Sequence, residues 1–269
     1  DEIMKRIAAD VHRREENRIL MVPELISHET ERRLCVAAGD TASRYAEVLS
    51  FTALARRVSE SMGSAAMECL DNGGRVVAMA AAARQMSSRL KAYAAVETKP
   101  EFLTGLIDAI DEFKRCCITS ADLQFAAEST EGSLAQKLEE LALLMEGYDA
   151  LCQQGKRDPR DQMTWCLEQM ESGDFAKNHV FYIDGFPDFT RQHMAILESS
   201  NVTVSLNCDS IGSNLLAFEK AGDTAQQIIR CAHKAGIEVE IQVIPEEKTP
   251  LGVVRSRLFQ GSIVTGAAK

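Results

Sequence analysis

The chain has 269 residues, of which 45% are apolar and 26% charged, and its formal net charge is −10. This composition is typical of a globular protein with a core, and the length predicts one large domain or two small ones. No apolar run reaches about 18 residues, so we expect no membrane span. The acidic balance argues against tight nucleic-acid binding by this chain alone, because phosphates need a basic surface, but a local basic groove or a larger assembly stays possible.

The amino-terminal residues do not form a signal peptide, and they begin with Asp rather than Met, which suggests a piece of a longer protein. Eight cysteines are spread over positions 35, 69, 116, 117, 152, 166, 208 and 231 without any C-x-x-C pair. This spacing argues against a zinc site and favours free, mostly buried thiols in a reducing cytosol. We therefore expect a cytoplasmic protein.

Residues 1–60 alternate between helix and strand patterns. Apolar spacing predicts a helix over 1–14 and a buried strand over 18–22. Ser27 is expected to cap a helix that ends at Gly39, and a short strand over 47–50 and a further helix follow. The alternation is typical of the first half of a parallel sheet with crossover helices.

The pattern over 61–176 is helical only, which predicts an all-helical insertion. Helices are expected over 76–96, 101–116 and 133–154, with further helices beginning at Ser120 and Pro159. The acidic groups Glu139–Glu140 and Asp108/Asp111/Glu112 are typical of solvated helix faces.

The α/β pattern returns over 177–250 and predicts the second half of the same sheet. Strands are expected over 180–183, 202–206 and 237–243, where the last alternates apolar and polar residues. Thr224 is expected to cap a helix that runs to Lys234. The remaining residues, 251–269, are expected to form a tail or the start of a next segment.

The strand over 180–183 runs directly into Asp184. A continuous apolar run of this kind is typical of the middle of a parallel sheet, and ligands bind at the carboxyl ends of such strands. In nucleotide hydrolases this position holds an aspartate that reaches Mg²⁺, although Asp184 could equally cap the following turn. The next residue is Gly185, which cannot position a water as the glutamate of a catalytic Walker B pair does. No phosphate-binding loop of the form G-x-x-x-x-G-K-[ST] occurs in the sequence.

Ser50 and Phe51 lie at another transition from strand to helix. A hydroxyl and an aromatic ring at such a point can contact a phosphate and stack on a base of a single strand. The alternative is a helix cap followed by a core phenylalanine, and the sequence leaves both open.

Three stretches taken together resemble the N-terminal, helicase-like region of AddB (RexB in some lineages), the B subunit of the bacterial AddAB ATP-dependent helicase–nucleases. They are Arg-Ile-Leu-Met-Val-Pro-Glu at 18–24 with Ser27 and 30–34, Glu-Val-Leu-Ser-Phe-Thr-Ala-Leu-Ala-Arg-Arg-Val at 47–58, and Phe-Tyr-Ile-Asp-Gly-Phe-Pro-Asp-Phe-Thr at 181–190. The third stretch is the most specific, and the resemblance covers nearly the whole chain.

The resemblance implies a P-loop NTPase-like α/β sheet, the domain 1A of superfamily 1 helicases, with an all-helical 1B-type insertion. Asp184 then lies at a degenerate Walker B position, and Glu24, Ser27, Ser50 and Phe51 lie where related helicases contact DNA. The implied partners are an AddA-type helicase–nuclease subunit and single- and double-stranded DNA, with no membrane. ATP, Mg²⁺ and an iron–sulfur cluster are implied for the whole family protein. No cofactor, metal site or catalytic residue is expected in this chain.

Three functions stay open. The first is a fragment of the B subunit of an ATP-dependent helicase/deoxyribonuclease that processes double-strand breaks for recombinational repair. In this interpretation the fragment is an inactive scaffold that binds DNA and scans for Chi, and it lacks the nuclease domain. The alternatives are an active nucleotide hydrolase whose P-loop precedes residue 1, and a protein-interaction domain that docks the motor subunit.

Overall fold

The computed structural model describes residues 2–62, 68–94, 99–154, 156–208, 211 and 216–244, so the tail expected over 251–269 lies outside the described residues. The chain divides into two compact units. The α/β unit comprises Asp1–Phe51, Asp174–Phe189 and His193–Lys269, and the helical unit comprises Thr52–Gly173 and Thr190–Gln192.

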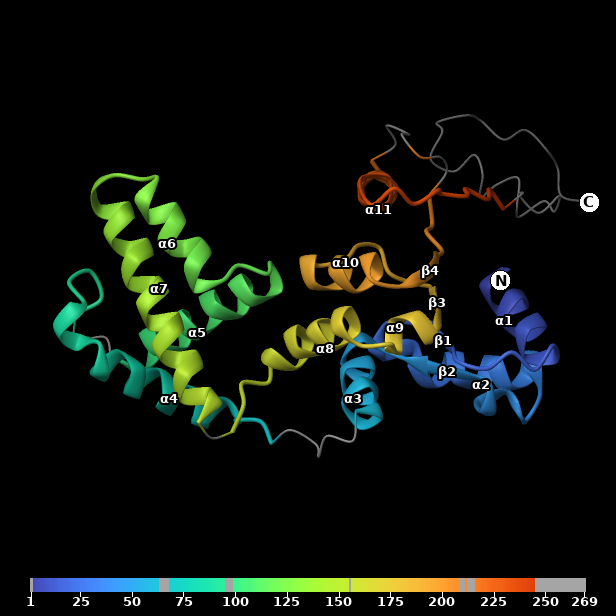
Figure 1. The fold of residues 1–269 in the computed structure, drawn as a ribbon, viewed down its shortest axis with the longest axis horizontal. Coiled ribbons are helices and arrows are strands. Elements are labelled where there is room, and N and C mark those ends of the chain that lie inside the picture. Colours follow the sequence, from blue (N-terminus) through green and yellow to red (C-terminus); the bar gives the residue numbers. More distant parts are fainter. Residues whose placement is uncertain are drawn as a thin grey trace, which may run out of the picture. The chain divides into compact units, whose positions relative to one another are not determined.

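The α/β unit is built on a four-stranded parallel sheet with the strand order β2-β1-β3-β4 (Figure 1). The strands are β1 (Arg18–Met21), β2 (Ala46–Leu49), β3 (Val180–Ile183) and β4 (Asn201–Val204). β3 lies between β1 and β4, and Phe181 at its centre is 1% exposed. The prediction of a buried central strand before Asp184 is therefore confirmed.

Two helices cover one face of this sheet, α1 (Glu2–His12) and α2 (Ser27–Ala38). Ile7 and Leu34 from these helices share a core with Leu20 and Tyr182 from β1 and β3. Because side chains alternate along a strand, Ile19 faces the opposite side, where it is also buried. The unit also contains α9 (Phe175–Asn178), most of α10 (Arg191–Glu198), α11 (Glu219–Lys234) and the short 3-10 turns η1 (Glu24–Ile26) and η2 (Ala42–Arg44).

Two helix N-caps that the sequence predicts for the α/β unit are not found. Ser27 is the first residue of α2 rather than its N-cap, and its hydroxyl donates to the carbonyl oxygen of Glu24 at 2.8 Å. Thr224 lies inside α11, where its hydroxyl donates to the carbonyl oxygens of Lys220 and Pro187 at 2.8 and 3.1 Å. Both hydroxyls bond to carbonyls earlier in the chain, and the sequence pattern of a cap does not distinguish this arrangement.

The strand expected over 237–243 is also wrong. The segment is not paired as a strand, and Ile241 and Val243 are 56% and 78% exposed. Alternation of apolar and polar residues provides one apolar face, but a strand also needs a neighbouring strand to satisfy its backbone groups. Among the described residues, none supplies such a neighbour for this segment.

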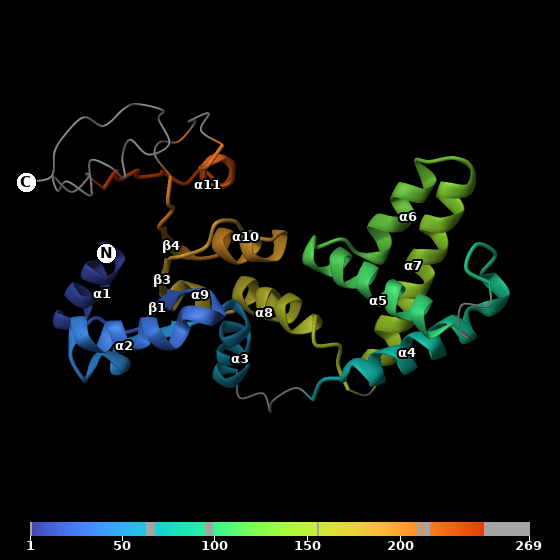
Figure 2. The same cartoon turned by 180° about the vertical axis from the view of Figure 1, so that it is seen from behind.

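The helical unit contains nearly all of α3 (Phe51–Ser61), then α4 (Asn72–Gln85), α5 (Pro100–Arg115), α6 (Ser120–Glu128), α7 (Gly132–Gln153), α8 (Asp161–Ser172) and the short 3-10 turn η3 (Ser87–Arg89) (Figure 2). Its own core includes Met79, Ile110, Leu144 and Tyr148. Helices make up most of its described residues, and the assignment of 61–176 to a separate inserted domain stays a prediction. The cap expected at Ser120 belongs instead to Thr119, which forms a capping box with Asp122. In the part of the chain that is described, no helix is long and apolar enough to cross a membrane.

Candidate functional site

The carboxyl edge of the sheet brings the predicted site residues together. Met21 of β1 is in register with Leu49 of β2 and with Ile183 of β3, so the three strands end side by side. Glu24 opens η1 shortly after β1, Ser50 follows β2, and Asp184 follows β3. This is the edge at which open α/β sheets bind ligands.

A hydrogen bond links the connections that leave β1 and β2. The hydroxyl of Ser50 donates to the carboxylate of Glu24, although the two residues are far apart in sequence. Ser50 is 5% exposed, whereas Glu24 is exposed to solvent. A ligand approaching this edge therefore meets the carboxylate of Glu24 before the hydroxyl of Ser50.

Phe51 lies in an aromatic cluster of the α/β unit. Its ring stacks on that of His193 with centroids 3.8 Å apart, and Phe186 meets it edge-on at 5.3 Å. Phe51 is 5% exposed, so a nucleic-acid base would reach its ring only after a neighbouring side chain had moved. Burial lowers the pKa of His193 to about 4, with Asp188 opposing the shift. Contact between Phe51 and DNA stays a prediction.

Asp184 offers a carboxylate to a ligand. Its backbone N–H donates to the carbonyl oxygen of Met21 at 3.0 Å, which fixes the residue to the end of β1. Its half-buried side chain makes no hydrogen bond or ion pair with any residue that the structure describes. One such carboxylate fits a role beside Mg²⁺, but the sequence contains no loop that would cradle phosphates, and we derive no nucleotide chemistry from this site.

The described residues do not form a metal site with several side-chain ligands. They contain no cluster of three or more His, Cys, Asp or Glu residues that could hold a metal ion. The eight cysteines are free thiols, and an iron–sulfur cluster, which needs several cysteines around one centre, does not fit their placement.

Gly185 has a backbone conformation that disfavours a side chain. Its φ is +81°, in the left-handed region that glycine adopts readily. A Cβ atom at this position would lie 3.3 Å from Cδ1 of Ile26 and 3.4 Å from Cδ of Pro23. A catalytic glutamate after Asp184 would therefore need a strained backbone and a small shift of the Ile26 side chain.

We expect Gly185→Ala to lower the free energy of unfolding by about 1–2 kcal/mol, because it adds backbone strain and a tight contact with η1. Gly236→Ala is the control, since Gly236 has a φ of +71° and open space around a Cβ atom. Chemical denaturation of both variants separates strain from contact. Equal losses of unfolding free energy in the two variants would show that η1 accommodates the added methyl group without cost.

Two polar arrangements in the helical unit were not predicted. Glu140 was expected on a solvated face but is 3% exposed, and its carboxylate accepts hydrogen bonds from the backbone N–H groups of Lys91, Ala92 and Tyr93 at 2.9, 3.0 and 2.9 Å. Asp111 was also expected to be solvated but is 5% exposed, paired with Arg75 and Arg160. These partners are 36–49 residues away in sequence, so the local pattern of charges carries no signal for either arrangement.

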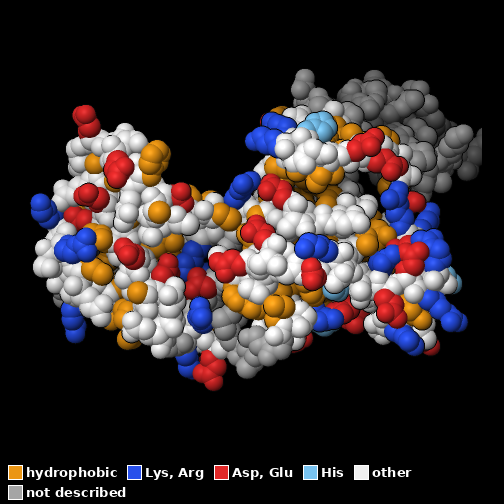
Figure 3. Space-filling view, viewed as in Figure 1, with side chains coloured by type: hydrophobic (Ala, Val, Ile, Leu, Met, Phe, Trp, Pro, Cys, Tyr) orange, Lys and Arg blue, Asp and Glu red, His pale blue; other side chains and the backbone are white. Residues whose placement is uncertain are grey.

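The surface charge is mixed. Figure 3 shows Lys and Arg side chains interspersed with Asp and Glu on the face drawn, without a continuous basic stripe among the described residues there. At the carboxyl edge of the sheet, Glu24 and Asp184 add two carboxylates. Phosphates are therefore not attracted to this edge by the residues named here.

Comparison with known proteins decides the family. Residues 1–254 match the family model described as ADDB, N-terminal. The chain belongs to the AddB N-terminal family. Similar proteins, each named as the B subunit of an ATP-dependent helicase/deoxyribonuclease, come from Thermoanaerobacter sp. (strain X514), with 29% identity over 86% of this chain, and from Clostridium kluyveri, with 28% identity over 88% of it.

A third relative with the same name, from Moorella thermoacetica, is 29% identical over 84% of the chain. In each case the matched region is only 21% of the relative's length. The resemblance seen in the sequence is thus confirmed, and the chain spans about a fifth of the length of these relatives.

Proposed function

We propose that the chain is the N-terminal, helicase-like part of the B subunit of an ATP-dependent helicase/deoxyribonuclease and serves there as a DNA-binding scaffold that does not hydrolyse nucleotide. The family membership supports the assignment to this protein. The main support for the inactive scaffold is Gly185, which has no side chain to position a water after Asp184 and whose left-handed backbone disfavours a glutamate there.

In this proposal an AddA-type subunit supplies the motor, and the complex processes double-strand breaks for recombinational repair. ATP, Mg²⁺ and an iron–sulfur cluster belong to other parts of the complex, and the nuclease domain lies outside this chain. The segments 1–60 and 177–250 form the two halves of a domain like 1A of superfamily 1 helicases, and 61–176 form the 1B-like insertion. The order α/β, helical, α/β along the chain supports this division.

The DNA strand, including any Chi sequence that it carries, is proposed to pass the carboxyl edge of the sheet near Glu24, Ser27 and Ser50. Because Glu24 and Asp184 repel phosphates, contact at this edge would involve bases and polar groups, while basic surface comes from the assembly. The alternatives are a nucleotide hydrolase completed by a P-loop elsewhere in the protein, and a domain that only docks the motor subunit.

The nucleotide test uses the full-length AddB-type protein without its partner. We expect Asp184→Ala to leave ATP turnover at the level of the unchanged protein. Gly185 stands where a catalytic Walker B motif has its glutamate, so Asp184 has no acidic partner. Turnover that is present and falls at least about ten-fold in Asp184→Ala would overturn the scaffold and favour the hydrolase, since metal-bridging carboxylates are worth several kcal/mol in phosphoryl transfer.

The DNA test uses the assembled complex. Ser50→Ala combined with Ser27→Ala is expected to reduce photocrosslinking of single-stranded DNA to the AddB-type chain roughly three- to ten-fold, as for loss of one or two polar contacts without a change of charge. Glu29→Gln is the control, because Glu29 lies on α2 and pairs with Arg32 on the surface. Unchanged crosslinking would favour the domain that docks the motor and does not touch DNA.

A further inference from the structure

The two segments that precede α4 and follow α7 lie side by side. The N–H of Leu70 donates to the carbonyl of Arg157 at 2.8 Å, and the N–H of Arg157 donates to the carbonyl of Glu68 at 2.9 Å. We name residues 68–71 and 156–161 the neck of the helical unit. The pair Lys156–Glu68 at 3.4 Å is largely exposed and contributes little, so these contacts alone hold the neck weakly.

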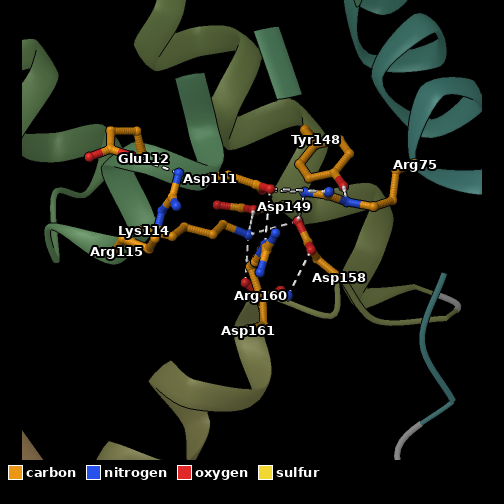
Figure 4. A network of polar contacts seen from close by, with 10 residues as sticks. All are labelled: Arg75, Asp111, Glu112, Lys114, Arg115, Tyr148, Asp149, Asp158, Arg160 and Asp161. Atoms are coloured by element: carbon orange, nitrogen blue, oxygen red, sulfur yellow. Dashed lines mark hydrogen bonds and ion pairs between the residues drawn. The ribbon is translucent and has the colours of Figure 1, made fainter. Parts of the chain in front are cut away.

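A buried carboxylate lies just inside the neck. The side chain of Asp158 is 0% exposed and lies 3.3 Å from Nη2 of Arg75 on α4 and 3.3 Å from Nζ of Lys114 on α5 (Figure 4). Its other oxygen accepts the backbone N–H of Arg160 at 2.9 Å. Asp158 therefore ties the carboxyl-terminal side of the neck to two helices at once.

Three further ion pairs extend the network. Lys114 also contacts Asp161 at 2.5 Å and Asp149 of α7 at 2.8 Å. Arg160 donates from Nε to Asp111 of α5 at 2.9 Å. The members of this network are Arg75, Asp111, Lys114, Asp149, Asp158, Arg160 and Asp161, and Figure 4 shows them converging from four segments of the helical unit.

The network depends on its cations. It contains four carboxylates and three cationic groups, so losing one cation leaves buried carboxylates without compensation, which is strongly unfavourable. Burial raises the pKa of Asp149, which Lys114 only partly opposes. The pKa of Asp158 lies below its ordinary value. Burial alone would raise it, but the opposing effects of Lys114, the backbone N–H of Arg160 and Arg75 are larger.

We propose that this ion network is a latch that holds the neck closed, so that residues 68–71 and 156–161 separate when the network breaks while the core of α4 to α7 stays folded. The core residues Met79, Ile110 and Leu144 form an apolar cluster of their own, which gives the helices a source of stability apart from the network. Opening of the neck is thus a local event of lower free energy than unfolding of the unit. The latch is independent of the proposed DNA-binding role.

The test is hydrogen exchange of the full chain, read at the amides of Leu70 and Arg157. Lys114→Met and, separately, Asp158→Asn are expected to speed exchange at these amides by at least about ten-fold. The amide of Leu123 on α6, which donates to Thr119 at 3.2 Å, should change by less than about two-fold. Arg115→Met is the matched control, because Arg115 is the next residue on α5 and pairs with Glu112 on the surface.

A covalent link distinguishes a latch from general stabilisation. Cys69 and Arg157 lie opposite each other in an isolated parallel β-bridge. Arg157→Cys therefore places a second thiol opposite that of Cys69. In the Lys114→Met background, oxidation of this pair should return the exchange rate at Leu70 to within about two-fold of the unchanged chain. Equal acceleration at Leu70 and Leu123, or no acceleration at Leu70, would overturn the latch. Should Lys114→Met not fold, that result would also overturn it, because the core would then depend on the network.

Discussion

Glu140→Ala is expected to lower the free energy of unfolding of the helical unit by about 3 kcal/mol, because it removes the charged acceptor of three backbone N–H groups. These donors come from Lys91, Ala92 and Tyr93, which follow η3. Gln136 also donates to the same carboxylate at 3.0 Å. The side chain thus fixes a loop whose backbone would otherwise need water.

The control for this prediction is the preceding residue of α7. Glu139→Ala removes an equal charge from an exposed position and should change stability by less than about 0.5 kcal/mol. Denaturant titrations of both variants give the comparison. Similar losses for the two would show that the N–H groups find other acceptors at no cost.

The same site predicts a dependence on pH. Burial raises the pKa of Glu140, but the N–H groups of Ala92, Lys91 and Tyr93 outweigh it and leave the pKa below its usual value of 4.5. A carboxylate with a lowered folded pKa stabilises the fold above the unfolded pKa, and this contribution is lost as the pH falls further. The difference in stability between the unchanged chain and Glu140→Ala should therefore shrink below about pH 4.5.

The α/β unit is expected to lose about 2–3 kcal/mol of stability between pH 6.5 and 4 through His193 alone. Burial lowers the pKa of this histidine from 6.5 to about 4. In that interval the unfolded chain binds a proton that the folded chain does not, so the unfolded state is favoured as the pH falls. Below about pH 4 both states are protonated and the contribution levels off.

His193→Phe tests this interval, because phenylalanine keeps a ring against Phe51 but does not titrate. Stability of the variant, measured by denaturant at several pH values, should fall less steeply between pH 6.5 and 4 by about 2–3 kcal/mol in total. His28→Phe is the control, since His28 is exposed on α2. A slope unchanged by His193→Phe would mean that the imidazole is protonated in the folded state as readily as in the unfolded state.

The features that depend on local periodicity were predicted from the sequence. The apolar run before Asp184 and the alternation of helices and strands determine a parallel sheet, because a strand buried on both faces shows no polar positions. The helices expected over 101–116 and 133–154 were predicted from their helical spacing of apolar residues. The helix expected over 76–96 is too long, because α4 ends at Gln85. The alternating run over 237–243 shows the limit, since a pattern of side chains does not reveal whether a second strand is available to pair with it.

The role of the candidate site residues stays a prediction, and their contacts were not predicted. Ser50 and Asp184 were identified at strand ends and Glu24 through the family resemblance, and parallel register places the ends of β1, β2 and β3 side by side. The hydrogen bond from Ser50 to Glu24 joins different loops and has no local signature. Glu140 and Asp111 were misread as solvated because burial of a charge depends on partners that the fold brings from elsewhere.

The left-handed conformation of Gly185 has a consequence for how this protein could change. A substitution that places an acidic residue after Asp184 would bring its Cβ atom to 3.3 Å from Cδ1 of Ile26 and to 3.4 Å from Cδ of Pro23, in a backbone conformation that side chains rarely adopt. The position therefore resists an acidic side chain on two counts, the left-handed backbone of Gly185 and the close contact with η1.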